Sequence, residues 1–185
     1  MQRHPRGYIG KNHLTIGSDI LSVSKALQLP EQTLGPVWMA RLQSIEPRGW
    51  YPIHIFLELL ELLNNSVGRY GMLKVGRTLF KMSHEERVLR SFKDARHFIN
   101  GLDLIYHASN RGEHIGGWEV LSCVPGRAEL DKTTPHVCTM EEGLITSALA
   151  AIGVQALVEQ TVCFREGADS CRFVITSAAT DARWG

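Results

Sequence analysis

Three of the four cysteines are the residues whose type and spacing could support specific chemistry in this sequence. Cys163 and Cys171 lie on either side of an expected tight turn, so they can face each other across a pair of strands. Cys138 lies at the expected start of a helix, where backbone N–H groups favour a thiolate. Three thiolates and one nitrogen or oxygen donor would form a tetrahedral zinc site. The spacing is not that of a zinc finger or ribbon, so buried structural thiols are the alternative.

Aromatic residues spread along the chain could line an apolar cavity between helices and sheet. The polar tips of tryptophan and tyrosine could orient a small, largely apolar ligand in such a cavity. The alternative is that these side chains form an ordinary core. The candidate pocket residues are Trp50, Tyr51, Phe56, Phe98, Tyr106 and Trp118.

Motifs of common enzyme classes are missing from the sequence. It contains no phosphate-binding loop, no dinucleotide-binding G-x-G-x-x-G after a strand, no H-E-x-x-H and no G-x-S-x-G. The acidic residues and the eight histidines are scattered. We therefore assign no catalytic residue and expect a protein that is not an enzyme.

Length and charge restrict the class of protein further. A chain of 185 residues with 20 Lys+Arg and 19 Asp+Glu fits one domain without the basic surface that nucleic acid or anionic lipid requires. The longest apolar stretch, Ile53–Leu63, is interrupted by His54, Glu58 and Glu61, so we expect no membrane span. The first residues lack an apolar secretion segment. We expect a cytoplasmic protein with reduced cysteines.

The elements that must position these residues divide the chain into a helical part and a sheet part. We expect a flexible arm over 1–17, a helical part over 18–112, an α+β sheet part of the same domain over 113–178, and a tail over 179–185. Apolar periodicity and capping signals predict the helices. They are expected at Ile20–Leu29, Leu34–Ile45, Ile53–Val67, Tyr70–Met82, Ser83–Phe92 (opened by a Ser83–Glu86 capping box) and Ala95–Tyr106.

The last third of the chain has the composition of short strands around one helix. Strands are expected at Trp118–Val124, Arg127–Lys132, Val154–Phe164 and Ser170–Thr176, with a helix at Cys138–Ile152. The fold class is therefore α+β: a helical N-terminal half, then an antiparallel sheet in the order β-β-α-β-β, packed on helices.

Several of these segments resemble one known superfamily. It joins heme nitric oxide/oxygen binding (H-NOX) domains, 4-vinyl-reductase-type sensor domains and TRAPP vesicle-tethering subunits. The resemblance covers Glu46–Ile175 and is carried by Trp50–Pro52 with the helix after it, Phe98–His107, Val120–Gly126, Glu142–Val154, and the C-x7-C-x-F pattern from Cys163 to Phe173.

The resemblance implies a heme site that this sequence does not reproduce. H-NOX domains bind iron through the histidine of L-D-x-x-H, but here that position is Tyr106, and His107 is rotated about 100° around the helix. Of the Y-x-S-x-R heme clamp, only Ser122 matches. We expect a divergent, heme-free member, with heme held by Tyr106 or His107 as the alternative, since tyrosine can bind ferric heme.

The 4-vinyl-reductase-type sensors supply the closest comparison for the cysteines. The resemblance implies zinc bound by Cys138, Cys163 and Cys171 together with a glutamate three residues before Cys163. That position is Gln160 here, and its neighbour Glu159 is expected to point to the opposite face of the strand. The zinc site is therefore predicted with its fourth ligand unassigned.

Together, these features predict a non-enzymatic sensory domain that binds a small, largely apolar ligand and signals through a partner protein or a homodimer. The resemblance suggests that the dimer contact lies near Leu14–Ile45. The alternatives are a scaffold or assembly protein of TRAPP-like type and a heme-based gas sensor.

Overall fold

Alternating apolar residues in the last third of the chain form a four-stranded antiparallel sheet in the computed structural model, which describes residues 4–10 and 12–185. The strand order is β4-β5-β7-β6, and the elements follow one another along the chain in the expected sequence β-β-α-β-β. The α+β fold class is confirmed. These elements are β4 (Trp118–Val124), β5 (Arg127–Lys132), α7 (Cys138–Ala151), β6 (Ala156–Val162), a short 3-10 turn η2 (Phe164–Glu166) and β7 (Cys171–Ser177).

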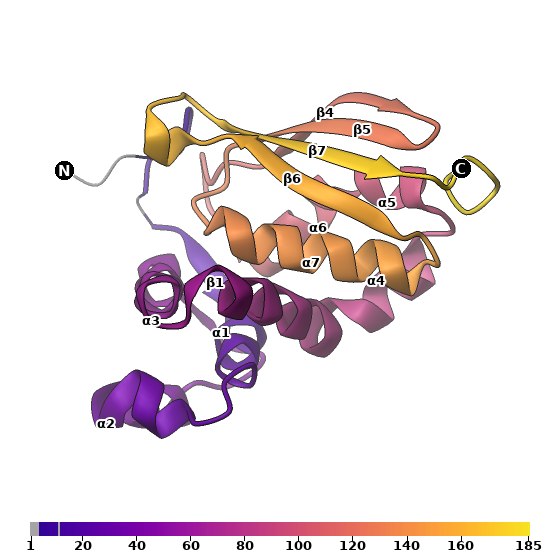
Figure 1. Ribbon diagram of the computed structural model, residues 1–185. Coiled ribbons are helices and arrows are strands. Elements are labelled where there is room, and N and C mark those ends of the chain that lie inside the picture. The colour runs from indigo at the N-terminus through magenta and orange to yellow at the C-terminus, as the bar shows by residue number, and fades with distance from the viewer. Residues whose placement is uncertain (1–3, 11) are drawn as a thin grey trace.

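Helices cover one face of this sheet in two layers. Figure 1 shows α7 beneath the sheet and α3 (Ile53–Leu79) on the far side of α7. The two helices approach closely because each has a glycine at the crossing. A Cβ atom on Gly76 would collide with the carbonyl oxygen of Met140, and one on Gly143 would collide with that of Leu73. The core lies between these layers.

The helical half contains the expected segments with different boundaries. The predicted helices Ile53–Val67 and Tyr70–Met82 are two parts of α3, separated by a kink at Gly68, whose φ of 63° is accessible to glycine. A similar kink at Gly35 divides α2. The remaining helices are α1 (Gly17–Ser24), α2 (Pro30–Gln43), α4 (Glu85–Ser91), α5 (Ala95–Asn100) and α6 (Leu102–Ser109).

The capping box predicted at Ser83 is wrong. A π-helical turn, η1 (Phe80–His84), continues directly from α3 into α4, and α4 has no side-chain cap. The Ser83 hydroxyl instead forms a 2.8 Å hydrogen bond with Ser22 of α1. A tertiary contact has therefore replaced the local cap that the sequence suggested.

A second, three-stranded sheet was not predicted. Its order is β2-β1-β3, and both pairings are antiparallel. The strands are β1 (Leu14–Ile16), β2 (Trp50–Pro52) and β3 (Asn110–Arg111). Strand β1 lies in the expected arm, where Tyr8 and His13 are also buried, so the described part of this segment packs on the domain. Residues 1–3 and 11 of the arm lie outside the described residues.

The last residues return to the body of the protein. Trp184 is fully buried, and the backbone N–H groups of Ala95 and Arg96, at the start of α5, donate to the carbonyl oxygens of Arg183 and Trp184. Among the described residues, no helix combines the length and the apolar character needed to cross a membrane.

Candidate functional site

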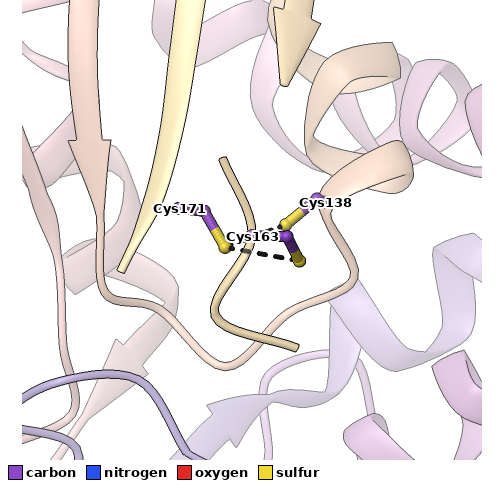
Figure 2. Close-up of side chains that lie close together, drawn as sticks. All are labelled: Cys138, Cys163 and Cys171. Atoms are coloured by element: carbon purple, nitrogen blue, oxygen red, sulfur yellow. Dashed lines mark hydrogen bonds between the residues drawn. The ribbon is translucent and has the colours of Figure 1, made fainter. Parts of the chain in front are cut away.

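The three cysteines predicted as metal ligands come together at one end of the four-stranded sheet. Cys138 is the first residue of α7, Cys163 directly follows β6, and Cys171 is the first residue of β7. The turn between Cys163 and Cys171 reverses the chain, which places both thiols near the N-terminus of α7. All three side chains are buried (Figure 2).

The distances between the sulfur atoms suit a zinc ion. The Sγ atoms of Cys138 and Cys171 are 3.3 Å apart, and those of Cys171 and Cys163 are 3.9 Å apart. All three lie within 4.8 Å of one another. With a Zn–S distance of about 2.3 Å, the edge of a tetrahedron measures about 3.8 Å. The cluster is therefore close to the size that tetrahedral thiolate coordination requires.

A buried lysine adjoins the cluster. Lys132, the last residue of β5, is fully buried, and its Nζ atom lies 3.5 Å from Cys138 Sγ. Nζ also donates to the carbonyl oxygens of Thr134 at 3.2 Å and His136 at 2.7 Å. These three acceptors use all the donors of an ammonium group, so the lysine can remain charged in the interior.

The pKa values of Cys138 and Cys171 shift in opposite directions. The hydrogen bond with Cys171 is the main reason that the pKa of Cys138 falls to about 6; burial opposes this shift, and the positive charge of Lys132 supports it. The same hydrogen bond and burial raise the pKa of Cys171. The lowered pKa favours the thiolate form of Cys138, and thiolates are the form of cysteine that binds metals.

The expected fourth-ligand region does not contribute a carboxylate. Glu159 is exposed and pairs across the sheet with Val174, whereas Gln160 is half-buried. The backbone N–H of Gln160 donates to Glu142 of α7, whose other carboxylate oxygen binds Arg69 at 2.6 Å. A bulge follows Gln160 in β6, but Glu159 still lies on the exposed face.

An interior cavity lies between the helices near the start of α7. Its volume is about 30 Å³, enough for one or two water-sized molecules and far below the roughly 300 Å³ of a typical small-molecule site. Three candidate pocket residues, Phe56, Tyr106 and Trp118, contribute to its wall. The Tyr106 hydroxyl donates to the carbonyl oxygen of Ile115 at 2.6 Å.

The other three candidate pocket residues lie elsewhere. Phe98 is buried in the core but is not part of the cavity wall. Trp50 and Tyr51 belong to β2, where the guanidinium group of Arg111 lies 3.9 Å from the centre of the Trp50 ring and the Tyr51 hydroxyl accepts the N–H of Glu46. Ligand binding by the six aromatic residues stays a prediction.

Two histidine–carboxylate pairs also line the cavity. His136 Nδ1 lies 3.1 Å from Glu141, and His84 Nε2 lies 3.5 Å from Asp19; all four side chains are buried. Burial alone would raise the pKa of Asp19, but the charge of His84 and hydrogen bonds from His84 and Ser83 hold it below its ordinary value.

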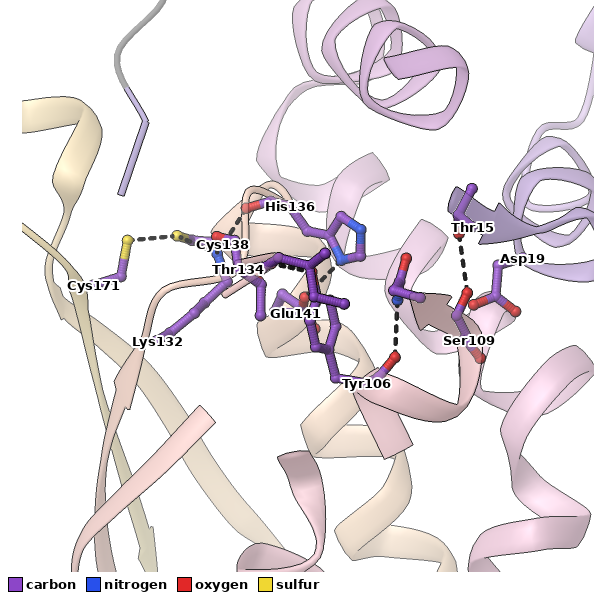
Figure 3. A network of polar contacts seen from close by, with 12 residues as sticks. Thr15, Asp19, Tyr106, Ser109, Lys132, Thr134, His136, Cys138, Glu141 and Cys171 are labelled. Atoms are coloured by element: carbon purple, nitrogen blue, oxygen red, sulfur yellow. Dashed lines mark hydrogen bonds and ion pairs between the residues drawn. The ribbon is translucent and has the colours of Figure 1, made fainter. Parts of the chain in front are cut away.

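Polar contacts connect the cysteine cluster with this cavity. Figure 3 shows these contacts in order. Cys171 contacts Cys138, and the Lys132 ammonium contacts Cys138. The same ammonium donates to the backbone carbonyl of His136, and the His136 ring bonds to Glu141. Across the described part of the chain, His136 Nε2, His84 Nδ1 and Asn110 Oδ1 are buried at the cavity without a hydrogen-bond partner. These atoms suit water molecules in the cavity.

A larger groove lies on the surface between the N-terminal segment and α3. Its volume is about 880 Å³, and its wall combines apolar residues such as Leu57 and Leu62 with Glu58 and Glu61. Both carboxylates are already paired, Glu58 with Arg41 and Glu61 with Arg165. The groove therefore has little free charge with which to orient a ligand.

Sequence reasoning missed Lys132 and the two histidine–carboxylate pairs. Lys132 had a detectable signal: in β5 it shares the buried face with Ala128 and Leu130, because residues two apart point to the same side of a strand. Glu141 follows His136 closely at the start of α7, which is a weaker local signal. The pairing of Asp19 with His84 depends on the tertiary fold and has no sequence signal.

Comparison with known proteins identifies the fold but no family. No family model matches the sequence, and no curated protein matches it. Solved structures do match. An H-NOX protein from S. oneidensis in the Fe(II)NO state has 15% identity and a TM-score of 0.67, with 88% of this chain and 98% of that chain covered.

Two further structures agree with this likeness. An unliganded Fe(II) H-NOX protein from K. algicida has 13% identity and a TM-score of 0.64, covering 91% of this chain and 100% of that one. An oxygen-binding H-NOX domain related to soluble guanylate cyclases has 12% identity and a TM-score of 0.59, covering 89% and 93%. At this identity the likeness establishes the fold alone: the chain has the fold of H-NOX domains.

Proposed function

We propose that this protein is a non-enzymatic sensory domain that keeps the H-NOX fold and uses zinc, bound by Cys138, Cys163 and Cys171, as its central group. The observation that carries the proposal is the convergence of three buried sulfur atoms within 4.8 Å, beside a buried lysine. Zinc has no redox chemistry of its own, so a change in its ligands would alter the structure rather than transfer electrons.

The sensory role is supported by the fold. The structures similar to this chain are described as H-NOX domains in Fe(II), CO, NO or oxygen-bound states, which makes small-molecule sensing the leading class of function. Likeness of fold alone does not indicate which group senses the molecule, so that assignment is based on the residues of the site.

The residues of this chain do not fit a heme. The cavity that Tyr106 lines has a volume of only about 30 Å³. The Tyr106 hydroxyl is bound to the carbonyl oxygen of Ile115, and His107 lies on the surface beside Asp103. Four buried ionisable side chains also line the space, and a heme would have to displace them or leave them without partners.

The cavity also bears on the proposed small ligand. A volume of about 30 Å³ favours a molecule of only a few atoms over a larger apolar compound. Binding would act by shifting the domain between two arrangements, which a partner protein or a second copy would read. Lys132 and His136 would couple such a shift to the cysteine cluster, because they connect the two sites.

A second candidate is a scaffold or assembly protein of the TRAPP-like type. The nearly filled interior favours it, since a scaffold needs no ligand cavity, and the exposed apolar residues Leu29, just before α2, and Val37, within α2, could contact a partner. This candidate predicts a constitutive complex whose formation does not depend on metal.

Native mass spectrometry with metal analysis and an absorption spectrum tests the proposal. We expect one zinc per chain in the wild type and none in Cys163→Ser, with Cys123→Ser as the matched control that retains zinc because Cys123 lies outside the cluster. Incubation with hemin should give no stoichiometric complex. A metal-free wild type or a one-to-one heme complex would contradict the proposal.

A further inference from the structure

The surface groove between the N-terminal segment and α3 has the size of a small-molecule site. Its volume of about 880 Å³ falls within the roughly 300–1,000 Å³ of typical ligand sites. Because the groove lies on the surface, a ligand can reach it without passing through the core. One side of the groove is apolar and consists of Leu14, Pro52, Ile53, Leu57 and Leu62.

The charges of the groove are already paired within the protein. Glu58 lies 3.1 Å from Arg41, and Glu61 lies 2.8 Å from Arg165. Among the described residues of the wall there is no lysine or arginine. A ligand with a full charge would therefore lose water without gaining a free partner of opposite charge, so the groove favours an uncharged molecule.

His13 adds a hydrogen-bond acceptor to the wall of this groove. Its side chain is only 3% exposed, and its Nε2 atom lies 2.6 Å from the carbonyl oxygen of Glu113. A carbonyl oxygen only accepts, so Nε2 carries the proton and Nδ1 of the neutral ring keeps its lone pair. Within the described part of the chain, Nδ1 is buried without a partner, which is unusual for a polar atom.

Tyr8 adds a donor next to this acceptor. Its ring centre lies 4.9 Å from that of His13 in an edge-to-face arrangement, and both residues belong to the wall of the groove. The Tyr8 hydroxyl forms no hydrogen bond with the described residues, and burial raises the pKa of Tyr8 to about 12. The hydroxyl therefore keeps its proton at neutral pH and can donate it.

We propose that this groove binds an uncharged, largely apolar molecule that carries a hydroxyl group. The hydroxyl oxygen of the ligand accepts from Tyr8 and its proton is donated to His13 Nδ1, while the hydrocarbon part packs on Leu57 and Leu62 of α3. A carboxylate has no proton to donate and an ammonium group has no lone pair, so neither can make both bonds. None of the three clustered cysteines lines the groove, so the inference does not depend on the proposed zinc centre.

Nuclear magnetic resonance tests the inference in the full-length chain. Backbone ¹H–¹⁵N spectra are recorded during titration with 1-hexanol, and we expect saturable shifts centred on Tyr8, His13 and Leu57, with the amides of Cys138 and Cys171 unmoved. The isomeric ether 1-methoxypentane has the same atoms but no hydroxyl proton, so it should bind about 10-fold more weakly. Hexanoate and hexylammonium should give no saturable shift at the groove, because each is charged.

Tyr8→Phe removes the donor and keeps the ring. We expect it to bind 1-hexanol about 2- to 10-fold more weakly, which corresponds to the loss of one hydrogen bond. Tyr70→Phe, on an exposed position of α3 outside the groove, is the matched control and should bind like the wild type. If Tyr8→Phe did not fold, the comparison of alcohol with ether in the wild type would still decide the question. Equal binding of alcohol, ether and carboxylate, shifts centred outside the groove, or no saturable shift would each overturn the inference.

Discussion

Lys132 provides the positive charge beside the cysteine cluster. A fully buried ammonium must find acceptors, and here one of its three acceptors is the sulfur of Cys138. The lysine therefore stabilises negative charge on the cluster and, through the carbonyl oxygen of His136, holds the segment that leads into α7. Its role is to position and balance the thiolates.

Replacing Lys132 tests this role directly. Lys132→Met keeps the apolar length of the side chain but removes the charge, so we expect zinc to bind about 10-fold more weakly, as is typical when a group that supports metal ligands is lost. The measurement is competition with a chromophoric zinc chelator. Lys74→Met, an exposed change on α3, is the matched control and should leave the affinity unchanged. Equal zinc affinities in Lys132→Met and Lys74→Met would show that Lys132 does not contribute to zinc binding.

The pair of Asp19 and His84 predicts a pH-dependent contribution to stability. The pKa of Asp19 is lowered in the folded protein, so the pair stabilises the fold above pH 3.8, and this stability is lost as the pH falls through the folded pKa. Asp19→Asn should cost about 1–3 kcal/mol of unfolding free energy at pH 7, with the difference shrinking in acid. Urea unfolding at several pH values measures it. Glu86→Gln, in an exposed ion pair with Arg90, should change little.

At the residue level, the sequence predicted the cysteines better than their surroundings. Cys163 and Cys171 flank a short turn, so a local pattern predicts that they lie close together, whereas Cys138 reaches them only because α7 packs on the sheet. Their neighbour Lys132 was visible only as a charged residue on a buried strand face. The Asp19–His84 pair joins α1 to the π-helical turn after α3, and no local pattern encodes such a contact.

Among the elements, the crossing of α3 and α7 depends on two glycines. Gly76 and Gly143 lie against backbone carbonyl groups of the opposite helix, and these cannot move aside as a flexible side chain could. Met140, whose carbonyl oxygen lies against Gly76, is only two residues after Cys138 in α7. The crossing therefore helps to fix the position of the first turn of α7, which contains Cys138.

Alanine at either glycine should be destabilising although alanine is the better helix former. Gly76→Ala and Gly143→Ala should each cost about 1–3 kcal/mol, because overpacking outweighs a gain in helix propensity of about 1 kcal/mol. Lys74→Ala, on an exposed position of α3, provides the control and should stay within about 0.5 kcal/mol of wild type. Chemical denaturation measures all three. Stabilisation by either glycine replacement would show that the helices can separate freely.

The elements were predictable where their patterns are local. The four strands and α7 follow from alternation, turns and helical spacing within the last third of the chain. The strands of the small sheet are only two or three residues long, and their partners are far apart in sequence, so they have no such signal. The helix expected to begin at Ser83 does not begin there, because the π-helical turn runs directly into α4. The Ser83 hydroxyl bonds to Ser22 of α1 and does not cap a helix.

For the whole molecule, α2 is the element farthest from the four-stranded sheet (Figure 1). It exposes Val37 at 79%, and Leu29 before its first turn at 56%. This helix lies within the Leu14–Ile45 segment expected to form the dimer contact, and burial of Val37 between two copies would remove its apolar surface from water. We infer that α2 contributes to self-association.

Val37→Glu should therefore disrupt the dimer. We expect the wild type to elute with the mass of two chains in light-scattering chromatography and the variant with that of one, because the substitution buries an unpaired carboxylate in an apolar contact. Tyr70→Glu is the matched control, since Tyr70 is 86% exposed on α3, outside that segment. A monomeric wild type at high concentration would exclude this role for α2.

The small sheet also has a consequence for how the chain folds. Thr15 pairs with Tyr51 on one side and with Asn110 on the other, so β1 cannot complete its hydrogen bonds until most of the first 110 residues are available. Closing the loop between β1 and β3 costs the most entropy, because Thr15 and Asn110 are 95 residues apart in sequence. In the larger sheet, β4–β5 and β6–β7 join consecutive strands, and the longest pairing, Arg127 with Thr176 between β5 and β7, spans 49 residues. We expect the C-terminal unit to organise first and the N-terminal strand to dock last. Strand β1 is thus synthesised before both strands that it pairs with, yet it reaches its native place after them.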